Sequence, residues 1–172
     1  MRSGIETYTG RWFDPGNPRV ADVCIEDIAH ALACTARFGG HIRKPYSVAQ
    51  HSVLCSKMAP DGLELQALLH DAHEAYILDM PRPIKALLPD YQAMERRVEQ
   101  VVRAALRIPA TLDTRVKEVD IRMLTTEAKS FGLSWWDWWP ECPPFAELGK
   151  LEPWPWAKAK QRFLDRFNAL GG

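Results

Sequence analysis

Apolar residues recur at helical spacing along most of the chain, and this pattern predicts an all-α fold of about six or seven helices. Glycine, proline and capping residues mark the breaks between the periodic stretches. The expected helices cover residues 25–38, 47–58, 62–79, 89–105, 111–131 and 157–170.

The central helix of this scheme is expected to be buried on nearly all sides. One side carries five apolar residues, Leu65, Leu68, Leu69, Ala72 and Tyr76. The opposite side carries three polar residues, His70, Asp71 and Glu74, flanked by Leu63, Ala67, Ile77 and Leu78. Burying an imidazole and two carboxylates among leucines costs several kcal/mol unless a metal ion or a dense hydrogen-bond network compensates. A metal ion is our working hypothesis.

Two further polar residues interrupt apolar stripes. His51 shares a helix face with Val48, Cys55 and Met58, and Asp120 lies in the stripe of the helix at 111–131. An unpaired buried aspartate is rarely tolerated, so Asp120 requires a partner such as a metal ion, an arginine or a helix N-terminus.

Glu127 follows Asp120 on the same predicted helix and lies close to the same stripe. It either supports the groups around a metal or pairs at the surface with Arg122 or Lys129, and the sequence does not separate these alternatives.

The chain is predicted to form a single domain, residues 1–172, because its length suits one hydrophobic core. Residues 1–21 form an irregular aromatic arm with room for one short strand, 22–131 a metal-binding helical core, 132–156 a flap and 157–172 a terminal helix. The flap interleaves prolines with six tryptophans, Trp135, Trp136, Trp138, Trp139, Trp154 and Trp156. We interpret it as hydrophobic cover or a subunit contact, in preference to a base-stacking role.

The amino-acid composition argues against a protein that binds nucleic acid polymers or membranes. The 22 basic and 22 acidic residues balance, which gives no long-range attraction to nucleic acid polymers or anionic membranes. No apolar run approaches the roughly 18 residues of a membrane span, and the four cysteines show no CxxC spacing. A cytoplasmic protein is therefore expected. An anionic ligand would need a local basic cluster, and the sequence offers Arg37, His41, Arg43, Lys44, Arg82 and Lys85.

The polar residues that occupy otherwise apolar helix positions together form one candidate site. Two imidazoles and two carboxylates, from His51, His70, Asp71 and Asp120, suit a borderline or hard divalent ion with positions left for water and substrate. Glu74 follows His70 by one helical turn, so it could orient or deprotonate a water, or protonate a leaving oxygen. The HExxH pattern of zinc proteases is absent, as are nucleotide-binding glycine loops.

The order of these residues resembles the HD-domain metal-dependent phosphohydrolases. The surrounding segments Arg37-Phe38, YSVAQHS, HDAHEAY and LDMPRPIK are similar to the small nucleotidase branch, which includes bacterial 5'-deoxynucleotidases and phage or prophage relatives. The similarity covers roughly residues 5–130, and Phe38 stands where the nucleotidases usually have tryptophan.

The resemblance implies residue roles. One divalent ion (Co, Mn, Zn, Mg or Ni) would be held by His51, His70, Asp71 and Asp120, and a second Mg²⁺ entering with substrate is allowed. Glu74 would be catalytic, Arg37 would meet the phosphate and Asp79 the sugar. The remaining substrate-binding candidates are Phe38, His41, Lys44 and Lys85.

The expected activity is release of phosphate from deoxynucleoside monophosphates. A deoxynucleoside triphosphate triphosphohydrolase, which would release tripolyphosphate, is the alternative, because the loop His41, Arg43, Lys44 carries more charge than one phosphate requires. A non-catalytic regulatory HD protein is a further alternative, although a structural metal site has no need of Glu74. The sequence leaves a homo-oligomer open.

Overall fold

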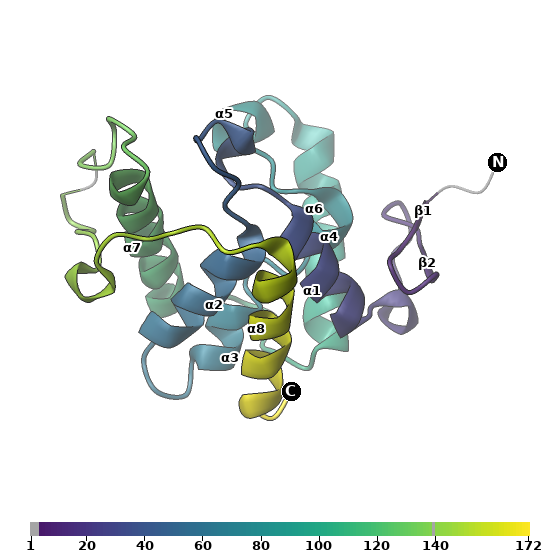
Figure 1. Ribbon diagram of the computed structural model, residues 1–172. Coiled ribbons are helices and arrows are strands. Elements are labelled where there is room, and N and C mark those ends of the chain that lie inside the picture. Colours follow the sequence, from purple (N-terminus) through teal and green to yellow (C-terminus); the bar gives the residue numbers. More distant parts are fainter. Residues whose placement is uncertain (1–3, 139) are drawn as a thin grey trace.

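The computed structural model describes residues 4–138 and 140–172, and in these residues the chain is mostly helical (Figure 1). Eight α-helices occur there: α1 (Ile25–Cys34), α2 (Val48–Met58), α3 (Glu64–Leu68), α4 (Glu74–Ile77), α5 (Arg82–Lys85), α6 (Pro89–Ala105), α7 (Thr114–Ser130) and α8 (Trp156–Ala169). The predicted helical class is confirmed, but the predicted count of six or seven is too low. The predicted central helix is divided in two, and α5 was not expected.

The N-terminal arm contains a small antiparallel hairpin. Strand β1 (Ile5–Glu6) pairs with β2 (Trp12–Phe13), with Ile5 opposite Phe13. Phe13 is fully buried and stacks on Tyr76 with ring centroids 4.0 Å apart. The arm is thus mostly irregular, as predicted, but it contains two paired strands where one was expected, and an aromatic ring packs it against the helical core.

Helix α2 is the centre of the fold. Every residue from Val48 to Ser56 is buried, because α1, α3, α7 and α8 all pack against this helix. In Figure 1, α7 lies on one side of α2, and α8 and α1 lie on the other. Ser47 caps the start of this helix, since its side chain accepts a hydrogen bond from the backbone N–H of Gln50.

The predicted helix at 62–79 is broken at the His70-Asp71 doublet, which is a correction to the sequence-based scheme. Residues 69–73 form turns between α3 and α4. Backbone bonds there join residues three apart, from Ala72 N to Leu69 O and from Glu74 N to Asp71 O, so the segment is wound more tightly than an α-helix. The expected burial of its apolar side holds, but Leu78 was expected to be covered and is 64% exposed.

The segment after α1 is extended, where the sequence predicted helix up to residue 38. The backbone N–H of Arg37 donates to Tyr46 O at 2.8 Å, and Ala36 forms a β-bridge with Ser47. Phe38 then has φ of 58°, a left-handed conformation that is unusual for a residue with a side chain. Arg37 is consequently held beside the start of α2.

Helix α6 follows its predicted stripe, with Val98 and Val102 buried. Arg103 of this helix is buried despite its charge and is only 2% exposed. Its Nε donates to Glu99 and its Nη1 to the carbonyl of Pro109, so local acceptors make its burial tolerable.

The C-terminal third completes the bundle. The flap is irregular, as predicted, apart from a 3-10 turn at Ala146–Leu148, and Trp139 lies outside the described residues. Helix α8 begins at Trp156, one residue before the predicted start, and buries Phe163. None of the helices in the described ranges has the length and hydropathy needed to cross a membrane.

Candidate metal centre and active-site cavity

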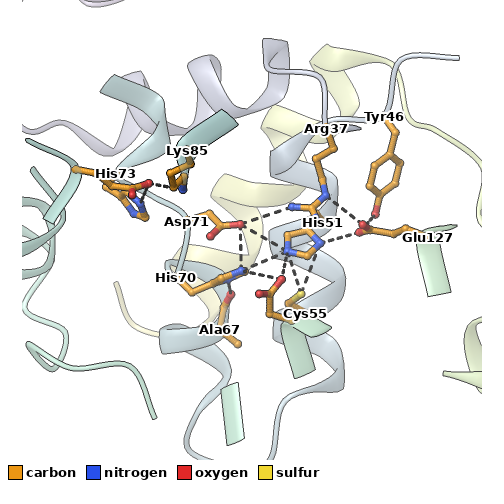
Figure 2. A network of polar contacts seen from close by, with 12 residues as sticks. Arg37, Tyr46, His51, Cys55, Ala67, His70, Asp71, His73, Lys85 and Glu127 are labelled. Carbon is orange, nitrogen blue, oxygen red and sulfur yellow. Dashed lines mark hydrogen bonds and ion pairs between the residues drawn. The ribbon is translucent and has the colours of Figure 1, made fainter. Parts of the chain in front are cut away.

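Four side chains from three parts of the chain converge in the interior. His51 comes from α2, His70 and Asp71 from the turn between α3 and α4, and Asp120 from α7. Nε2 of His51 lies 3.2 Å from Nε2 of His70, 3.2 Å from Oδ1 of Asp120 and 3.6 Å from Oδ2 of Asp71. Nε2 of His70 lies 3.1 Å from Oδ2 of Asp71 and 3.7 Å from Oδ1 of Asp120. The four predicted metal ligands are therefore close neighbours, and Figure 2 shows His51, His70 and Asp71 pointing toward one another.

The other ring nitrogen of each histidine fixes its tautomer. Nδ1 of His70 lies 2.7 Å from the carbonyl oxygen of Ala67, which can only accept a hydrogen bond, so Nδ1 carries the proton. Nδ1 of His51 lies 2.7 Å from Oε1 of Glu127 and donates to it. In the neutral rings both Nε2 atoms then carry lone pairs, and these face each other at 3.2 Å. Two facing lone pairs repel unless a cation or a proton lies between them.

Glu127 supports this arrangement from behind. It is fully buried and accepts three hydrogen bonds, from His51 Nδ1, from Tyr46 Oη at 2.8 Å and from Arg37 Nε at 3.1 Å (Figure 2). The sequence-based alternative of a surface pair with Arg122 or Lys129 is wrong, because Glu127 is buried; its contact with His51 is the one that a supporting role would require. A carboxylate behind a ligating histidine orients the ring and raises its basicity.

The separations of the four donors fit a small divalent ion. Ligands about 2.0 to 2.2 Å from an ion, at angles of about 90° to 110°, lie roughly 2.8 to 3.6 Å apart. Five separations among these donors run from 3.1 to 3.7 Å, which reaches just beyond the upper end of this range. The mixture of imidazole and carboxylate suits Zn, Mn, Co, Ni or Mg, and the distances alone do not choose among them.

Cys55 offers a second donor set. Its Sγ, His51 and His70 form a buried group whose ligand atoms lie within 4.8 Å of one another, and such a group could also hold a metal ion. However, Sγ lies 3.5 Å from Nε2 and 3.8 Å from Nδ1 of His51. Because it is almost equidistant from the two nitrogens, it lies beside the ring and away from the direction of the Nε2 lone pair. We therefore favour the carboxylates as the partners of the two histidines.

Charges around the donors favour a cation at this point. Burial lowers the pKa of His70, but Asp71 and Asp120 outweigh burial and raise it well above its ordinary value. Burial raises the pKa of Asp71, but the imidazole of His70 outweighs it and lowers that pKa far below the usual range. The cluster therefore stabilises positive charge between its carboxylates.

A cavity of about 570 Å³ opens directly onto this cluster. Asp71 and Asp120 line its floor together with Arg37 and Glu74. The rest of its lining is Phe38, Asp79, Met80, Pro81, Arg82, Pro83, Lys85, Leu124, Trp135 and Trp138. The metal-ligand candidates, the catalytic candidate and four of the six substrate-binding candidates thus belong to one neighbourhood.

Glu74 combines burial with an unsatisfied oxygen. The residue is 6% exposed, and its buried Oε2 has no hydrogen-bond partner in the described residues. Burial, and then the charges of Asp71 and Asp79, raise the pKa of Glu74 well above its ordinary value. Burial likewise raises the pKa of Asp79. A protonated carboxyl with a free oxygen at a cavity floor is suited to proton transfer.

The basic candidates separate into two groups. Arg37 is 8% exposed and lines the cavity, as do Arg82 and Lys85. His41 and Lys44 are exposed and absent from the cavity lining, and Lys44 pairs with Glu152 at 3.5 Å. The loop charge on which the triphosphate alternative was based therefore lies outside this cavity.

Sequence reasoning did not identify several residues of the site. Tyr46 is one, and Glu95 of α6 is another, since it binds Lys85 Nζ at 2.5 Å and lies 3.6 Å from His73 Nε2. Trp135 and Trp138 were interpreted as cover or contact and lie in the cavity lining. For the tryptophans the Trp/Pro-rich composition was a signal, but nothing in the sequence indicated Glu95.

Comparisons with known proteins identify relatives. No protein-family model matches the chain. It is 41% identical over 170 residues to the uncharacterized protein YfdR of Escherichia coli strain K12, covering 98% of this chain and 96% of that protein. It is 38% identical over 126 residues to the uncharacterized protein RCAP_rcc00048 of Rhodobacter capsulatus, covering 67% of this chain and 64% of that protein.

Proposed function

The chain belongs to the same protein family as YfdR of Escherichia coli, and we propose that it is a divalent-metal-dependent phosphohydrolase of the HD superfamily. Its proposed substrates are deoxynucleoside 5'-monophosphates, and its products are the nucleoside and inorganic phosphate. The observation that carries this proposal is the convergence of His51, His70, Asp71 and Asp120 beside a cavity. Asp71 and Asp120 line that cavity together with Arg37 and Glu74. Four free cysteines suit the reducing cytoplasm in which such substrates occur.

The four converging side chains would hold one divalent ion. When bound, such an ion lowers the pKa of a water molecule toward about 7 and offsets negative charge on phosphoryl oxygens. Glu127 keeps His51 in the tautomer that presents Nε2, and the carbonyl of Ala67 does the same for His70.

Arg37 is placed to receive the phosphate. Its Nε binds Glu127 at 3.1 Å and its Nη1 lies 3.7 Å from Oδ2 of Asp71, so the guanidinium is fixed in orientation where it lines the cavity. A planar guanidinium presents paired donors that match phosphate oxygens. Lys85, held by Glu95, adds a second positive charge at the cavity wall.

Glu74 is assigned the proton transfer. Burial favours its protonated form, and its free Oε2 can give the proton to the 5'-oxygen as the bond from that oxygen to phosphorus breaks. A water oxygen forms the new bond to phosphorus, so the nucleoside leaves with its hydroxyl restored. Asp79, also in the cavity lining, can accept a hydrogen bond from a sugar hydroxyl.

A monophosphate is the preferred substrate class because the exposed loop adds no charge to the cavity lining. Triphosphate hydrolysis remains the second candidate, since Arg82 and Lys85 both line the cavity with Arg37. The two candidates differ in product, because only the second releases tripolyphosphate from dATP.

The proposal is tested by metal content and product analysis on the purified protein. Metal is removed by a chelator, and the protein is reloaded separately with Mg, Mn, Co, Ni or Zn. Phosphate release is then followed on deoxynucleoside and ribonucleoside monophosphates, and dATP products are separated by chromatography. Metal-dependent release of phosphate from deoxynucleoside monophosphates is expected. Stoichiometric metal without turnover of any nucleotide would instead favour a non-catalytic regulatory protein.

A further inference from the structure

A row of aromatic rings extends from the phosphate-binding candidate toward the mouth of the cavity. The guanidinium carbon of Arg37 lies 5.6 Å from the ring centroid of Phe38. Phe38 lies 6.2 Å from the ring of Trp135, and Trp135 lies 6.4 Å from that of Trp138. All four residues line the same cavity, so one ligand held at Arg37 would have aromatic faces beside it.

Two of these aromatic residues adopt conformations or positions that are unfavourable for the folded chain on its own. Phe38 has a left-handed backbone with φ of 58°, a conformation that a residue with a Cβ rarely adopts. Strained backbone of this kind persists where the surrounding structure holds it, and it clusters at ligand sites. Trp138 is 70% exposed although tryptophan is among the largest apolar side chains. A bound flat, apolar ligand would cover this exposed ring.

The cavity lining contains both polar and apolar side chains. Its floor holds the carboxylates, Arg37 and Glu74, while Leu124, Trp135 and Trp138 supply apolar surface. A base-free sugar phosphate could satisfy the polar floor and would leave the aromatic surface uncovered. A nucleotide satisfies both, because its base has an aromatic face.

We propose that Phe38, Trp135 and Trp138 form a platform that binds the nucleobase of the substrate. The proposal rests on the proposed function and adds a substrate class to it: nucleotides of any base, with purines preferred over pyrimidines and base-free sugar phosphates disfavoured. Stacking tolerates every base because all have a π-face, and the larger purine ring covers more aromatic surface.

The experiment compares ligands that differ only in the base. Binding of dAMP, dCMP and 2-deoxyribose 5-phosphate is measured by calorimetry on metal-loaded protein in which Glu74→Gln slows hydrolysis and the aromatic residues are wild type or substituted, and phosphate release is measured separately with Glu74 intact. The variants are Trp138→Ala, Trp135→Ala and the conservative Trp135→Phe. The matched control is Trp156→Ala, because Trp156 is also an exposed tryptophan, at 55%, but is absent from this cavity lining.

Wild-type protein is expected to bind dAMP more tightly than dCMP, and dCMP more tightly than the base-free sugar phosphate. Trp138→Ala and Trp135→Ala should weaken dAMP binding by about 5- to 150-fold and leave 2-deoxyribose 5-phosphate unchanged. Trp135→Phe should keep most of the dAMP affinity that Trp135→Ala loses, and Trp156→Ala should leave the affinity unchanged. Folding of each variant is checked by circular dichroism.

Equal binding of dAMP and 2-deoxyribose 5-phosphate by the wild type would overturn the platform. So would an equal loss for both ligands in the Trp135 and Trp138 variants, since that pattern marks a general disturbance of the cavity. Base-dependent binding without any release of phosphate would support the platform and count against the phosphohydrolase, so the two failures can be told apart.

Discussion

Replacing Glu127 by glutamine tests whether this buried carboxylate orients His51 in the proposed metal site. Oε1 of Glu127 accepts from Tyr46 and His51, and Oε2 accepts from Arg37. An amide has only one oxygen, so in either orientation its NH₂ group faces a donor that has no other acceptor there. Even the orientation that keeps the bond to His51 removes the negative charge that makes this imidazole more basic.

The expected magnitudes follow from these contacts. Loss of one partner from a buried ion pair costs about 3 to 5 kcal/mol, which is a large part of the roughly 5 to 15 kcal/mol that stabilises a domain. Loss of the group behind a ligating histidine typically lowers metal affinity about 10- to 100-fold. Glu127→Gln should therefore reduce both the free energy of unfolding and the affinity for metal.

Two measurements separate these effects. Urea unfolding in excess chelator reports the stability of the metal-free chain, and calorimetric titration with Mn²⁺ or Co²⁺ reports metal affinity under native conditions. Glu118→Gln is the matched control, because Glu118 is an exposed glutamate on the same helix, α7. Tyr46→Phe removes one donor and keeps the charge of Glu127, so it should affect metal affinity less. The reasoning would be refuted if Glu127→Gln bound metal as tightly as Glu118→Gln.

Four further substitutions test other parts of the structure. Asp71→Ala should abolish metal binding and turnover together. Glu74→Gln should retain metal, measured by elemental analysis, and should lower kcat about 10²- to 10⁴-fold. Full turnover of the Glu74→Gln protein with metal bound would remove Glu74 from the mechanism. Lys44→Ala should change the free energy of unfolding by less than about 0.5 kcal/mol and leave monophosphate turnover intact, because its ion pair is exposed. A selective loss of triphosphate turnover in that variant would reverse the substrate ranking. Tyr76→Phe should cost about 1 to 3 kcal/mol in urea unfolding, since Tyr76 Oη accepts a buried hydrogen bond from the backbone of Cys24; an unchanged midpoint would show that water replaces it.

Hydrophobic periodicity predicted the long helices well because their stripes are continuous. Helices α6, α7 and α8 begin within three residues of the expected positions, and their apolar stripes supply core residues such as Val98, Val116 and Phe163. The same signal gives no indication that Arg103 is buried, because its partners are one turn away and on the following loop, where periodicity carries no information.

The candidate site was predictable as a set of residue types and incompletely as a set of contacts. His51 and Asp120 were identified because polar groups interrupt apolar stripes, and both lie in the cluster. Glu127 could not be assigned, since its partner Arg37 is 90 residues away whereas Arg122 and Lys129 are near in sequence. The charge of the loop at Lys44 was interpreted incorrectly for the same reason: Lys44 pairs with Glu152, which is distant in the sequence, at the C-terminal end of the flap.

The break in the predicted central helix explains how adjacent residues can serve one site. In an α-helix neighbouring side chains diverge by about 100°, so a doublet would not normally aim two ligands at one point. Here residues 69–73 turn with bonds between residues three apart, and Nε2 of His70 lies 3.1 Å from Oδ2 of Asp71. Leu69 and Ala72 are buried on the opposite side and hold the turn against the core. The candidate ligands thus converge where the helical core departs from regular helix, and the turn brings both members of the doublet to His51.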